Sequence, residues 1–367
     1  MDQFEIYMTA TPGFEHALLA EALENGFANA QVSQGGVTIM GGWPDVWRAN
    51  LTMRGATRVL ARVGSFMAFH LAQLDKRARK FPWGDILDPK WPVRVEVSTN
   101  KLSKIYHAGA ATQRFETALH ESHGMVISPD AAIVIKVRID DNRVTISLDT
   151  SGESLHKRGH KEAVNKAPMR ETLAALFLRE CGYTGKEPVL DPMCGSGTFP
   201  IEAAEIALGL YPGRTRHFAF EHFSSFDPAA WDEMRKQTSK TTEQRFFGSD
   251  RDAGAIRMSH ANAARAGVDP FITFENSAIS DLKRPDGPPG LIICNPPYGG
   301  RIGNPKLLFG LYASLGQTLK ANFGGWRVGI ITSDAGLAKS TGLPFKPKGA
   351  PVPHGGLKVW LFQTGPL

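Results

Sequence analysis

Three short stretches of the chain combine residues that can bind a charged small molecule with residues that can hold an amine. They are VLDPMCGSGTFPIEAA at residues 189–204, FFGSDRDAGAI at residues 246–256 and LIICNPPYGGRIG at residues 291–303. Each begins with an apolar run typical of a buried strand. Ligands on mostly parallel sheets bind outside the carboxyl ends of the strands. We therefore expect the polar residues of all three stretches to line one site.

The first stretch predicts a strand that ends at Asp191, a Gly-Ser-Gly turn and a helix that begins near Thr198. Gly195 and Gly197 allow the backbone to approach a ligand closely, and the free N–H groups of a helix N-terminus bind anionic groups such as carboxylates. No GK[ST] follows the turn, and no third glycine completes the pattern GxGxxG. The turn is therefore neither a P-loop nor a dinucleotide fingerprint.

Asp191 narrows the choice of ligand further. A carboxylate at this strand end repels a diphosphate but attracts an ammonium group. S-adenosylmethionine carries both an ammonium and a carboxylate, so the turn favours it as the cofactor. The residues predicted to bind it here are Asp191, Pro192, Cys194, Gly195, Ser196, Gly197 and Thr198.

The second stretch places Asp250 at the end of the next strand, directly before a helix. A carboxylate at this position can accept hydrogen bonds from both ribose hydroxyls of a nucleoside. It could instead cap the helix, but Asp252 is the better candidate for the N-cap, which leaves Asp250 free for the ligand. Arg251, between the two acids, is included in the predicted cofactor site.

The third stretch ends an apolar strand in Asn-Pro-Pro-Tyr. The side-chain oxygen of Asn295 and the carbonyl of Pro296 can both accept hydrogen bonds from one amine, and Pro297 stiffens the loop because its φ is fixed. Tyr298 offers a flat face on which a nucleobase can stack. An ordinary turn after a strand is the alternative, but the order of the three stretches favours a site that presents a base amine to an electrophile. These four residues are the predicted catalytic group, and Asn295 is also placed beside the cofactor.

The pattern of predicted elements divides the chain into four parts. Residues 1–60 and 61–155 each predict a small α/β unit, and residues 156–168 predict a basic linker. From residue 169 to residue 367, helices alternate with strands that are apolar on both faces. That alternation is typical of a mostly parallel sheet with helices on both faces, so the predicted fold class is α/β.

The net charge of +6 is unevenly distributed. Residues 51–170 contain 20 Lys and Arg against 12 Asp and Glu. A surplus of this kind could dock a polyanion, although a solvated surface with uneven charge would give the same counts.

Three cysteines, Cys181, Cys194 and Cys294, are too few for a disulfide framework and lack the spacing of zinc ligands. We expect no metal ion and no covalent nucleophile. No apolar run reaches about 18 residues, and the N-terminus lacks a signal-peptide pattern. A reducing, cytoplasmic location is therefore expected.

The motifs DPMCGSGT, GSD and NPPYGGRIG, in that order, resemble class I S-adenosylmethionine-dependent methyltransferases of the amino-methylating type. The more specific resemblance is to RNA guanine-N2 methyltransferases that carry a THUMP domain, and among these to the bacterial 23S rRNA (guanine-N2) methyltransferase family. It covers nearly the whole chain and is specific from residue 149 onward, where residues 149–178 resemble the family's junction between RNA-binding and catalytic parts. Residues 1–60 would then be a ferredoxin-like unit, residues 61–155 a THUMP RNA-binding domain, and residues 169–367 a Rossmann-like methyltransferase domain.

The resemblance also implies roles for the predicted residues. Asp191 and residues 195–197 would line the methionine end of the cofactor, Asp250 would bind the ribose, and residues 295–298 would hold the target base. Two positions depart from the family pattern. Ala278 stands where the family usually has an acid that contacts the adenine amino group, so Ser277 or a backbone carbonyl is the expected substitute. His160 stands where the family prefers an aromatic residue.

The predicted reaction is N2-methylation of a guanine in RNA, with large-subunit (23S) rRNA as the expected substrate and with neither DNA nor a membrane as a partner. A tRNA guanine is a close alternative. The amino group N6 of adenine is another, because Asn-Pro-Pro-Tyr suits any planar exocyclic amine. A different class is a non-catalytic RNA-binding ribosome-assembly factor. An NAD-dependent dehydrogenase is disfavoured by the glycine spacing.

Overall fold

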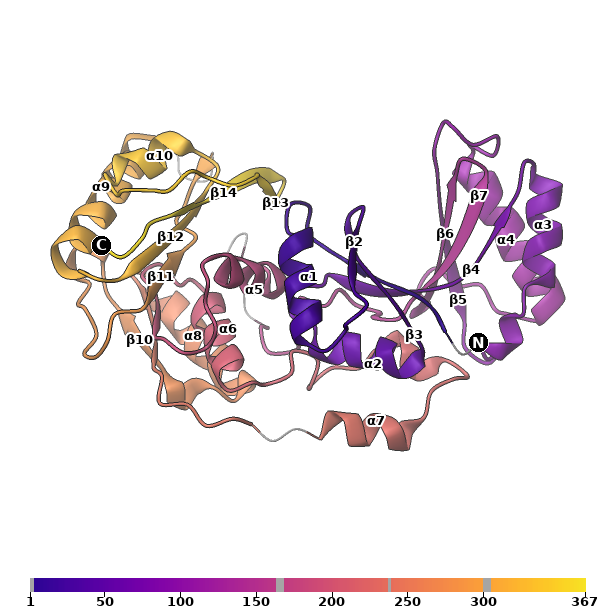
Figure 1. Ribbon diagram of the computed structural model, residues 1–367, viewed down its shortest axis with the longest axis horizontal. Helices are drawn as coiled ribbons and strands as arrows, with labels where there is room; N and C mark the ends of the chain where they lie inside the picture. The colour runs from indigo at the N-terminus through magenta and orange to yellow at the C-terminus, as the bar shows by residue number, and fades with distance from the viewer. Residues whose placement is uncertain (1–2, 163–167, 237–238, 300–304) are drawn as a thin grey trace. The chain divides into compact units, whose positions relative to one another are not determined.

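The computed structural model describes residues 3–162, 168–236, 239–299 and 305–367 (Figure 1). The chain folds into two compact units. Unit 1 comprises Met1–Ala10, Leu19–Leu155 and Gly213–Lys236, and unit 2 comprises Thr11–Leu18, His156–Pro212 and Gln237–Leu367. Within the described residues, no helix is long and apolar enough to cross a membrane.

Unit 1 is built on one seven-stranded sheet. Its strands are β1 (Phe4–Thr9), β2 (Gln31–Ser33), β3 (Gly36–Gly41), β4 (Arg58–Met67), β5 (Val93–Thr99), β6 (Ile133–Asp140) and β7 (Arg143–Asp149). They lie in the order β2-β3-β1-β4-β7-β6-β5, and only β5 and β6 are parallel. Because β4 pairs with both β1 and β7, the two predicted N-terminal parts share a sheet, and the boundary predicted at residue 60 falls inside β4.

The helices associated with these strands are α1 (Glu15–Glu24), α2 (Trp43–Thr52), α3 (Leu71–Lys80), α4 (Ala108–His123) and the short η1 (Trp83–Asp85). Helices α3 and α4 pack against each other. Asp141 and Asn142 form the turn between β6 and β7, and both have positive φ, 46° and 60°. Asp and Asn at positive φ are typical of the two-residue loops that join hairpin strands.

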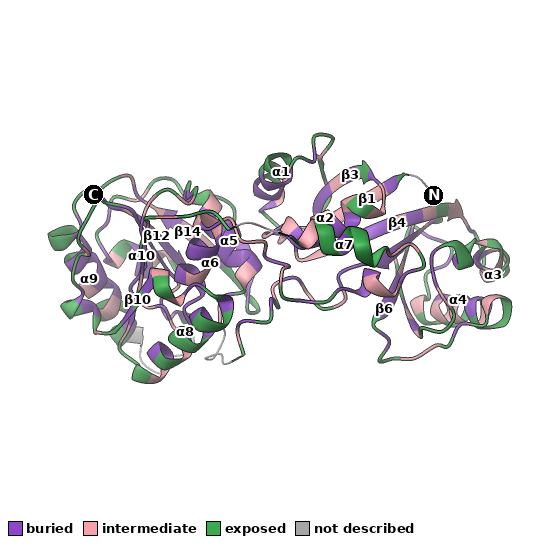
Figure 2. Cartoon of the chain, turned by 90° about the horizontal axis from the view of Figure 1, so that it is seen from below, coloured by how far each residue is buried: buried purple, intermediate pink, exposed green. Residues whose placement is uncertain are grey.

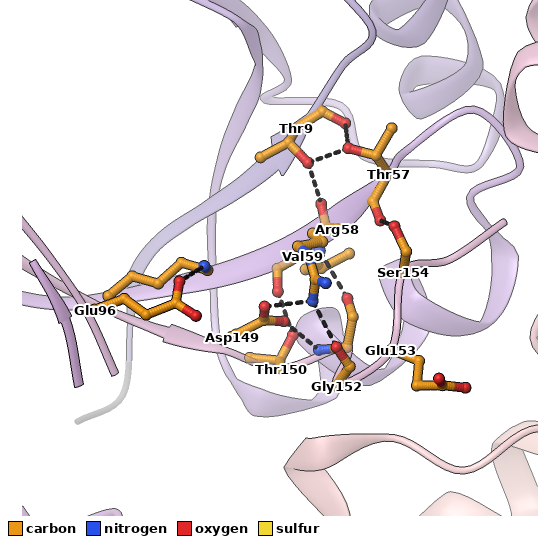
Figure 3. Close-up of polar contacts among 12 residues, drawn as sticks. Thr9, Thr57, Arg58, Val59, Glu96, Asp149, Thr150, Gly152, Glu153 and Ser154 are labelled. Carbon is orange, nitrogen blue, oxygen red and sulfur yellow. Dashed lines mark hydrogen bonds and ion pairs between the residues drawn. The ribbon is translucent and has the colours of Figure 1, made fainter. Parts of the chain in front are cut away.

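The chain that leaves β7 is fixed to the neighbouring strand β4 by polar contacts (Figure 3). The guanidinium of Arg58 donates to Asp149 Oδ2 and to the carbonyl of Gly152, both at 2.5 Å. Burial raises the pKa of Asp149, and the positive charge of Arg58 opposes that rise. The hydroxyl of Thr150 donates to the carbonyl of Val59 at 2.7 Å. These bonds hold the strand end that precedes the linker.

Gly213–Lys236 belongs to unit 1, although it lies within the part predicted as the methyltransferase domain. It contains η2 (Ala219–His222) and α7 (Pro228–Arg235). The buried guanidinium of Arg216 donates to the carbonyls of Ser151, Glu153 and Ser154 at 3.1, 2.7 and 3.0 Å. The ring of Phe220 stacks on that of Trp47. These contacts join residues far apart in the sequence, so no local sequence pattern distinguishes this segment from the methyltransferase domain on either side of it.

Unit 2 contains the second seven-stranded sheet, and its central strands are largely buried (Figure 2). They are β8 (Val189–Asp191), β9 (Phe246–Asp250), β10 (Ile272–Asn276), β11 (Leu291–Cys294), β12 (Arg327–Thr332), β13 (Val352–His354) and β14 (Leu357–Gln363). The order is β10-β9-β8-β11-β12-β14-β13. The five strands from β10 to β12 are parallel, and β14 and β13 are antiparallel.

The helices of unit 2 are α5 (Glu171–Glu180), α6 (Thr198–Ala207), α8 (Ala253–Ala266), α9 (Pro305–Asn322), α10 (Ala335–Ser340), η3 (Asp269–Phe271) and η4 (Ile279–Asp281). Helix α6 packs against α5 and α8, and α9 packs against α10 on the other side of the sheet (Figure 1). This arrangement confirms the predicted α/β fold class. The sequence did not predict α7, α10 or the terminal pair β13 and β14.

Candidate active site

The three predicted stretches begin with the strands β9, β8 and β11, which lie next to one another in the sheet. Strands β8 and β11 pair in parallel, with Val189 opposite Leu291 and Leu190 opposite Ile292. The strand order reverses between them, and such a switch point is where parallel sheets bind ligands. Asp191 and Asn295 therefore emerge at the same edge. Asp250 ends β9, on the other side of β8, so the fold brings all three polar ends together.

The glycine turn has the shape that its sequence predicts. Gly195 and Gly197 have φ of 56° and 82°, in the region that favours glycine. Gly197 is the N-cap of α6, which begins at Thr198. A Cβ on Gly195 would meet no heavy atom within 4 Å, whereas one on Gly197 would come within 3.1 Å of the Ser259 side chain. The backbone at Gly195 thus faces open space, and Gly197 permits close packing on α8.

Two side chains of α8 and a backbone carbonyl of β9 hold the turn in place. The hydroxyl of Ser259 donates to the carbonyl of Gly195 at 3.0 Å, and the amide of Asn262 donates to the carbonyl of Ser196 at 3.0 Å. The N–H of Cys194 donates to the carbonyl of Ser249 at 2.9 Å. Sequence reasoning missed Ser259 and Asn262. Their positions on one face of a helix were visible, but the turn that they support lies more than 60 residues away.

Residues Arg158–Lys161, which we call the linker strap, pack against α6 in the interior of unit 2. The Lys161 ammonium donates to the hydroxyl of Thr198 at 3.0 Å and to the carbonyl of Met169 at 2.6 Å. Burial lowers the pKa of Lys161, while the charge of Glu171 opposes that shift. Lys161 is thereby bonded to the first residue of α6, directly after the glycine turn.

The rest of the strap is anchored by buried charge. Arg158 is 2% exposed and pairs with Glu202 and Glu205, which are each 1% exposed. His160 lies 3.4 Å from Glu205, measured between Nε2 and Oε1. Burial opposes the charge on Arg158, yet the two carboxylates raise its pKa. His160, predicted only as a departure from a family pattern, is here part of a structural anchor.

Asp191 is 2% exposed and accepts a hydrogen bond from the Met193 N–H at 3.0 Å. Burial raises the pKa of this carboxyl well above its usual range, and the nearby charge of Asp250 adds to the effect. Within the described residues, no Lys or Arg side chain acts on the Asp191 carboxyl. A cationic ligand would supply the missing counter-charge.

Asp250 does not cap α8, but it is bonded within the site. Its two oxygens accept hydrogen bonds from the N–H groups of Gly195, at 3.0 Å, and Asp252, at 2.9 Å. Asp252 is the N-cap of α8, as predicted, and accepts from the Gly254 N–H. Asp250 thus ties β9 to the glycine turn. A carboxylate has about four acceptor sites, so two remain for ribose hydroxyls.

The remaining predicted cofactor residues lie near the end of β9. Arg251 is exposed, and Ser277 is half-buried, with its N–H donating to the carbonyl of Asp250 at 3.1 Å. Ala278 is exposed and carries no polar side chain. Asn276, which the sequence analysis did not single out, donates its amide to the same Asp250 carbonyl at 2.9 Å.

In the third stretch, the side-chain oxygen of Asn295 is buried and has no hydrogen-bond partner among the described residues. Such a group is costly to leave unpaired, so its position points to a ligand. Pro296 is buried and Pro297 half-buried. Tyr298 is only 2% exposed, so its ring face is covered in this structure. Residues 300–304 lie outside the described residues.

The cysteines of the two loops are packing residues. Cys194 and Cys294 are buried, and burial raises the pKa of both thiols well above the usual value. Neither is therefore a thiolate at neutral pH. Within the described ranges, no group of three or more His, Cys, Asp and Glu could hold a metal ion.

These observations fit S-adenosylmethionine. The open space beside Gly195 allows a ligand to lie directly against the backbone. The N-terminus of α6 can bind the carboxylate of the cofactor. Asp191 lacks a cationic partner among the described residues, which suits an ammonium group. The assignment of individual residues to parts of the cofactor stays a prediction.

Comparison with known proteins identifies the family. Residues 158–344 match the family described as "RMKL-like, methyltransferase domain", and residues 5–60 match the "RlmL ferredoxin-like domain". The chain is 30% identical over 370 residues to a putative RNA methyltransferase of Synechocystis sp., covering 97% of this chain and 95% of the relative.

Two solved structures are similar over the whole chain. One is SMU.472, a putative methyltransferase complexed with SAH, with a TM-score of 0.88, 27% identity and coverage of 100% of this chain and 99% of the other. The second is a predicted N6-adenine-specific DNA methylase from Listeria monocytogenes, with a TM-score of 0.87, 28% identity and coverage of 100% and 97%. Together with the site geometry, these matches show that the chain belongs to the RMKL-like methyltransferase family and is an S-adenosylmethionine-dependent methyltransferase.

Proposed function

We propose that the protein methylates N2 of a guanine in RNA, with large-subunit rRNA as the substrate. The observation that carries the proposal is the buried Asn295 Oδ1, which has no partner among the described residues and lies at the strand end next to the glycine turn. A relative of nearly the same length is named a putative RNA methyltransferase, which supports RNA as the substrate.

The roles of the chain's own residues follow from the chemistry of an aromatic amine. The lone pair of guanine N2 is delocalised into the ring, which makes the amine a weak nucleophile. Hydrogen bonds from the NH2 group to Asn295 Oδ1 and to the Pro296 carbonyl would localise that lone pair and orient it. When bound, S-adenosylmethionine would supply an electrophilic methyl group on a positively charged sulfur. N2 would take the methyl group as the S–C bond breaks, and it would lose one proton to solvent. Positioning and electrostatics supply the rate enhancement.

Tyr298 is proposed to stack on the target base. Because its ring is 2% exposed, stacking requires a local rearrangement at this residue. Tyr312 on α9 is buried near this loop: burial raises its pKa, and Cys294 and Tyr298 are close enough to add to that rise.

The reaction is tested with purified protein, S-adenosylmethionine and either 23S rRNA or tRNA, followed by mass spectrometry of the nucleosides. We expect N2-methylguanosine in 23S rRNA. The Asn295→Ala variant should lower the rate by about 100-fold or more, as loss of a transition-state hydrogen bond does. Its affinity for S-adenosylmethionine should stay within about twofold of the wild type, because Asp191 and the glycine turn are unchanged. Near-normal turnover of this variant would contradict the proposal.

The second candidate is methylation of adenine N6. It is favoured by the Asn-Pro-Pro-Tyr sequence, which accepts any planar exocyclic amine, and by the name of the similar structure from Listeria monocytogenes. N6-methyladenosine in the same assay would establish this second candidate. N2-methylguanosine found only in tRNA would show that tRNA, and not rRNA, is the substrate. Binding of RNA and cofactor without any product would favour an assembly factor.

A further inference from the structure

The last part of unit 2, residues 335–367, contains four lysines and no aspartate, glutamate or arginine. The lysines are Lys339, Lys346, Lys348 and Lys358, and all four are exposed. None of them pairs with a carboxylate among the described residues. Cations that the fold does not neutralise attract a polyanion. This part of the chain therefore carries a positive charge that its own structure does not use.

Part of this segment is the C-terminal hairpin, by which we mean β13, its turn and the start of β14, residues 352–360 (Figure 1). Strand β14 is antiparallel to β12, with Trp360 opposite Thr332, the last residue of β12. The residues before Trp360 therefore lie beyond the carboxyl end of β12. Asn295 emerges at the same edge of the sheet, because β11 and β12 are parallel neighbours. The hairpin thus projects past the edge at which the candidate active site lies.

The hairpin also reaches the loop that carries Tyr298. A Cβ on Gly299 would lie 3.4 Å from Cδ1 of Leu357, so the Leu357 side chain packs beside this loop. Leu357 is nevertheless 39% exposed. An exposed apolar side chain beside a ligand site can contact a bound ligand. Leu357 is therefore available to a substrate that enters the candidate active site.

The turn of the hairpin fixes the position of Leu357. Gly355 and Gly356 have φ of 57° and 82°, and a type I′ turn requires positive φ at both of its central residues. His354, on the other side of the turn, pairs with Leu357 and is buried. A preformed surface of this kind loses little conformational freedom when it binds a partner.

The two faces of the hairpin differ in character. Side chains alternate along a strand, so Leu357 and Lys358 lie on opposite faces. Trp360 shares the face of Lys358, and the Lys348 ammonium lies 4.3 Å from the centre of the Trp360 ring. Both lysines are exposed. One face of the hairpin is therefore apolar and borders the loop of the candidate site, and the other is basic.

We propose that the C-terminal hairpin forms one wall of the target-base site, and that the RNA strand beside the target nucleotide crosses its tip. Leu357 packs against the neighbouring nucleotide, and Lys358 and Lys348 bind the phosphates that follow. A base held by residues 295–298 stays covalently joined to its neighbours, so these must lie at the rim of the site. The lysines without acidic partners favour a polyanion as the occupant. This inference rests on the proposed RNA substrate and names residues that contact it outside the Asn-Pro-Pro-Tyr loop.

The basic face is tested by filter binding of protein-free 23S rRNA at several salt concentrations and by the kinetics of its methylation. If the wild type methylates tRNA instead, tRNA is the probe. Lys358→Ala should raise the KM for RNA by about fivefold and reduce the slope of log Kd against log salt by about 0.7, because one phosphate contact is lost. Lys358→Arg should stay close to the wild type, since it keeps the charge. Lys186→Ala is the matched control, because Lys186 is exposed but precedes β8, at the opposite edge of the sheet.

The apolar face is tested with Leu357→Ala. This variant should lower kcat/KM for RNA by about tenfold, because the leucine side chain is no longer buried against the nucleotide. Leu357→Met should recover most of that loss, since it keeps a similar apolar volume. The affinity for S-adenosylmethionine and the Tm should equal those of the wild type in every variant, because residues 191–198 are unchanged.

Wild-type KM and salt slope in Lys358→Ala, together with wild-type kcat/KM in Leu357→Ala, would overturn the inference. Parallel losses of RNA turnover, cofactor affinity and Tm would also overturn it, because the hairpin would then only stabilise the fold. Failure of the proposed function is seen in the wild type by itself. An absence of methylated nucleoside in any RNA contradicts the function and the inference together, whereas normal product with unaffected variants contradicts the inference alone.

Discussion

Asp191 lies in the interior of unit 2, where solvent cannot stabilise its charge. Burial raises its pKa above the ordinary value of 3.8. Between 3.8 and the raised value, the ligand-free folded chain therefore binds more protons than the unfolded chain at this residue. The free energy of unfolding falls as pH rises through that window.

A bound ammonium group favours the charged carboxylate. We therefore expect binding of S-adenosylmethionine to release a proton from Asp191, and the affinity to increase as pH rises through the raised pKa. Calorimetry in two buffers that differ in ionisation enthalpy measures the proton release, and Asp191→Asn should abolish it. An identical binding enthalpy in both buffers, for the wild type across this pH range, would show that the carboxyl is already ionised without the ligand.

For Asn295, the sequence shows the residue type but not whether its side chain is buried or hydrogen-bonded. The sequence predicts an amide at a strand end, and only the structure shows that its oxygen is buried without a partner among the described residues. The buried, unpaired oxygen indicates a binding site, because an unsatisfied buried acceptor has a free-energy cost that a hydrogen bond from a ligand can remove.

At the scale of the elements, the linker strap contacts the first residue of α6. Lys161 links Glu171 on α5, the Met169 carbonyl and Thr198 on α6 through one ammonium group. We expect Lys161→Met to raise the Kd of S-adenosylmethionine by about tenfold, because the turn before Thr198 loses its support. Lys161→Arg, which keeps the donors, should recover most of the affinity.

A double-mutant cycle separates this positioning effect from a general loss of stability. Thr198→Val removes the hydroxyl that Lys161 contacts, so the two substitutions should be non-additive by roughly 0.5–3 kcal/mol in cofactor binding. Thermal unfolding provides the control. Additive effects on Kd, with the loss seen only in Tm, would mean that Lys161 stabilises the fold without shaping the turn.

For the molecule as a whole, the chain path is unusual in that Gly213–Lys236 leaves unit 2 between α6 and β9 and folds with unit 1. Arg216 holds this segment through three backbone carbonyls. We expect Arg216→Met to lower the stability of unit 1 by roughly 2–4 kcal/mol, because hydrogen bonds to a buried charged group are lost. Hydrogen–deuterium exchange should show faster exchange in residues 151–154 and 219–222. Loss of protection confined to α6 and β9 would contradict this.

The sequence by itself determined the alternation of helices and buried strands, the glycine turn, the start of a helix near Thr198, the cap at Asp252, and the type of each residue at the strand ends. These features are local: φ preferences, side-chain period and short hydrogen bonds act within a few residues. The resemblance of these motifs to a methyltransferase family predicted the fold and the cofactor, and the comparisons confirmed both.

Only the tertiary structure decided which distant groups meet. It joined β1 to β7 through β4 into one sheet, moved Gly213–Lys236 into unit 1, and bonded Asp250 to the glycine turn. It also placed Lys104 beside the Phe69 ring and bonded the Lys104 N–H to Asn142 in the β6–β7 turn. Contacts between residues tens of positions apart depend on the packing of whole elements, and a local pattern carries no information about that packing.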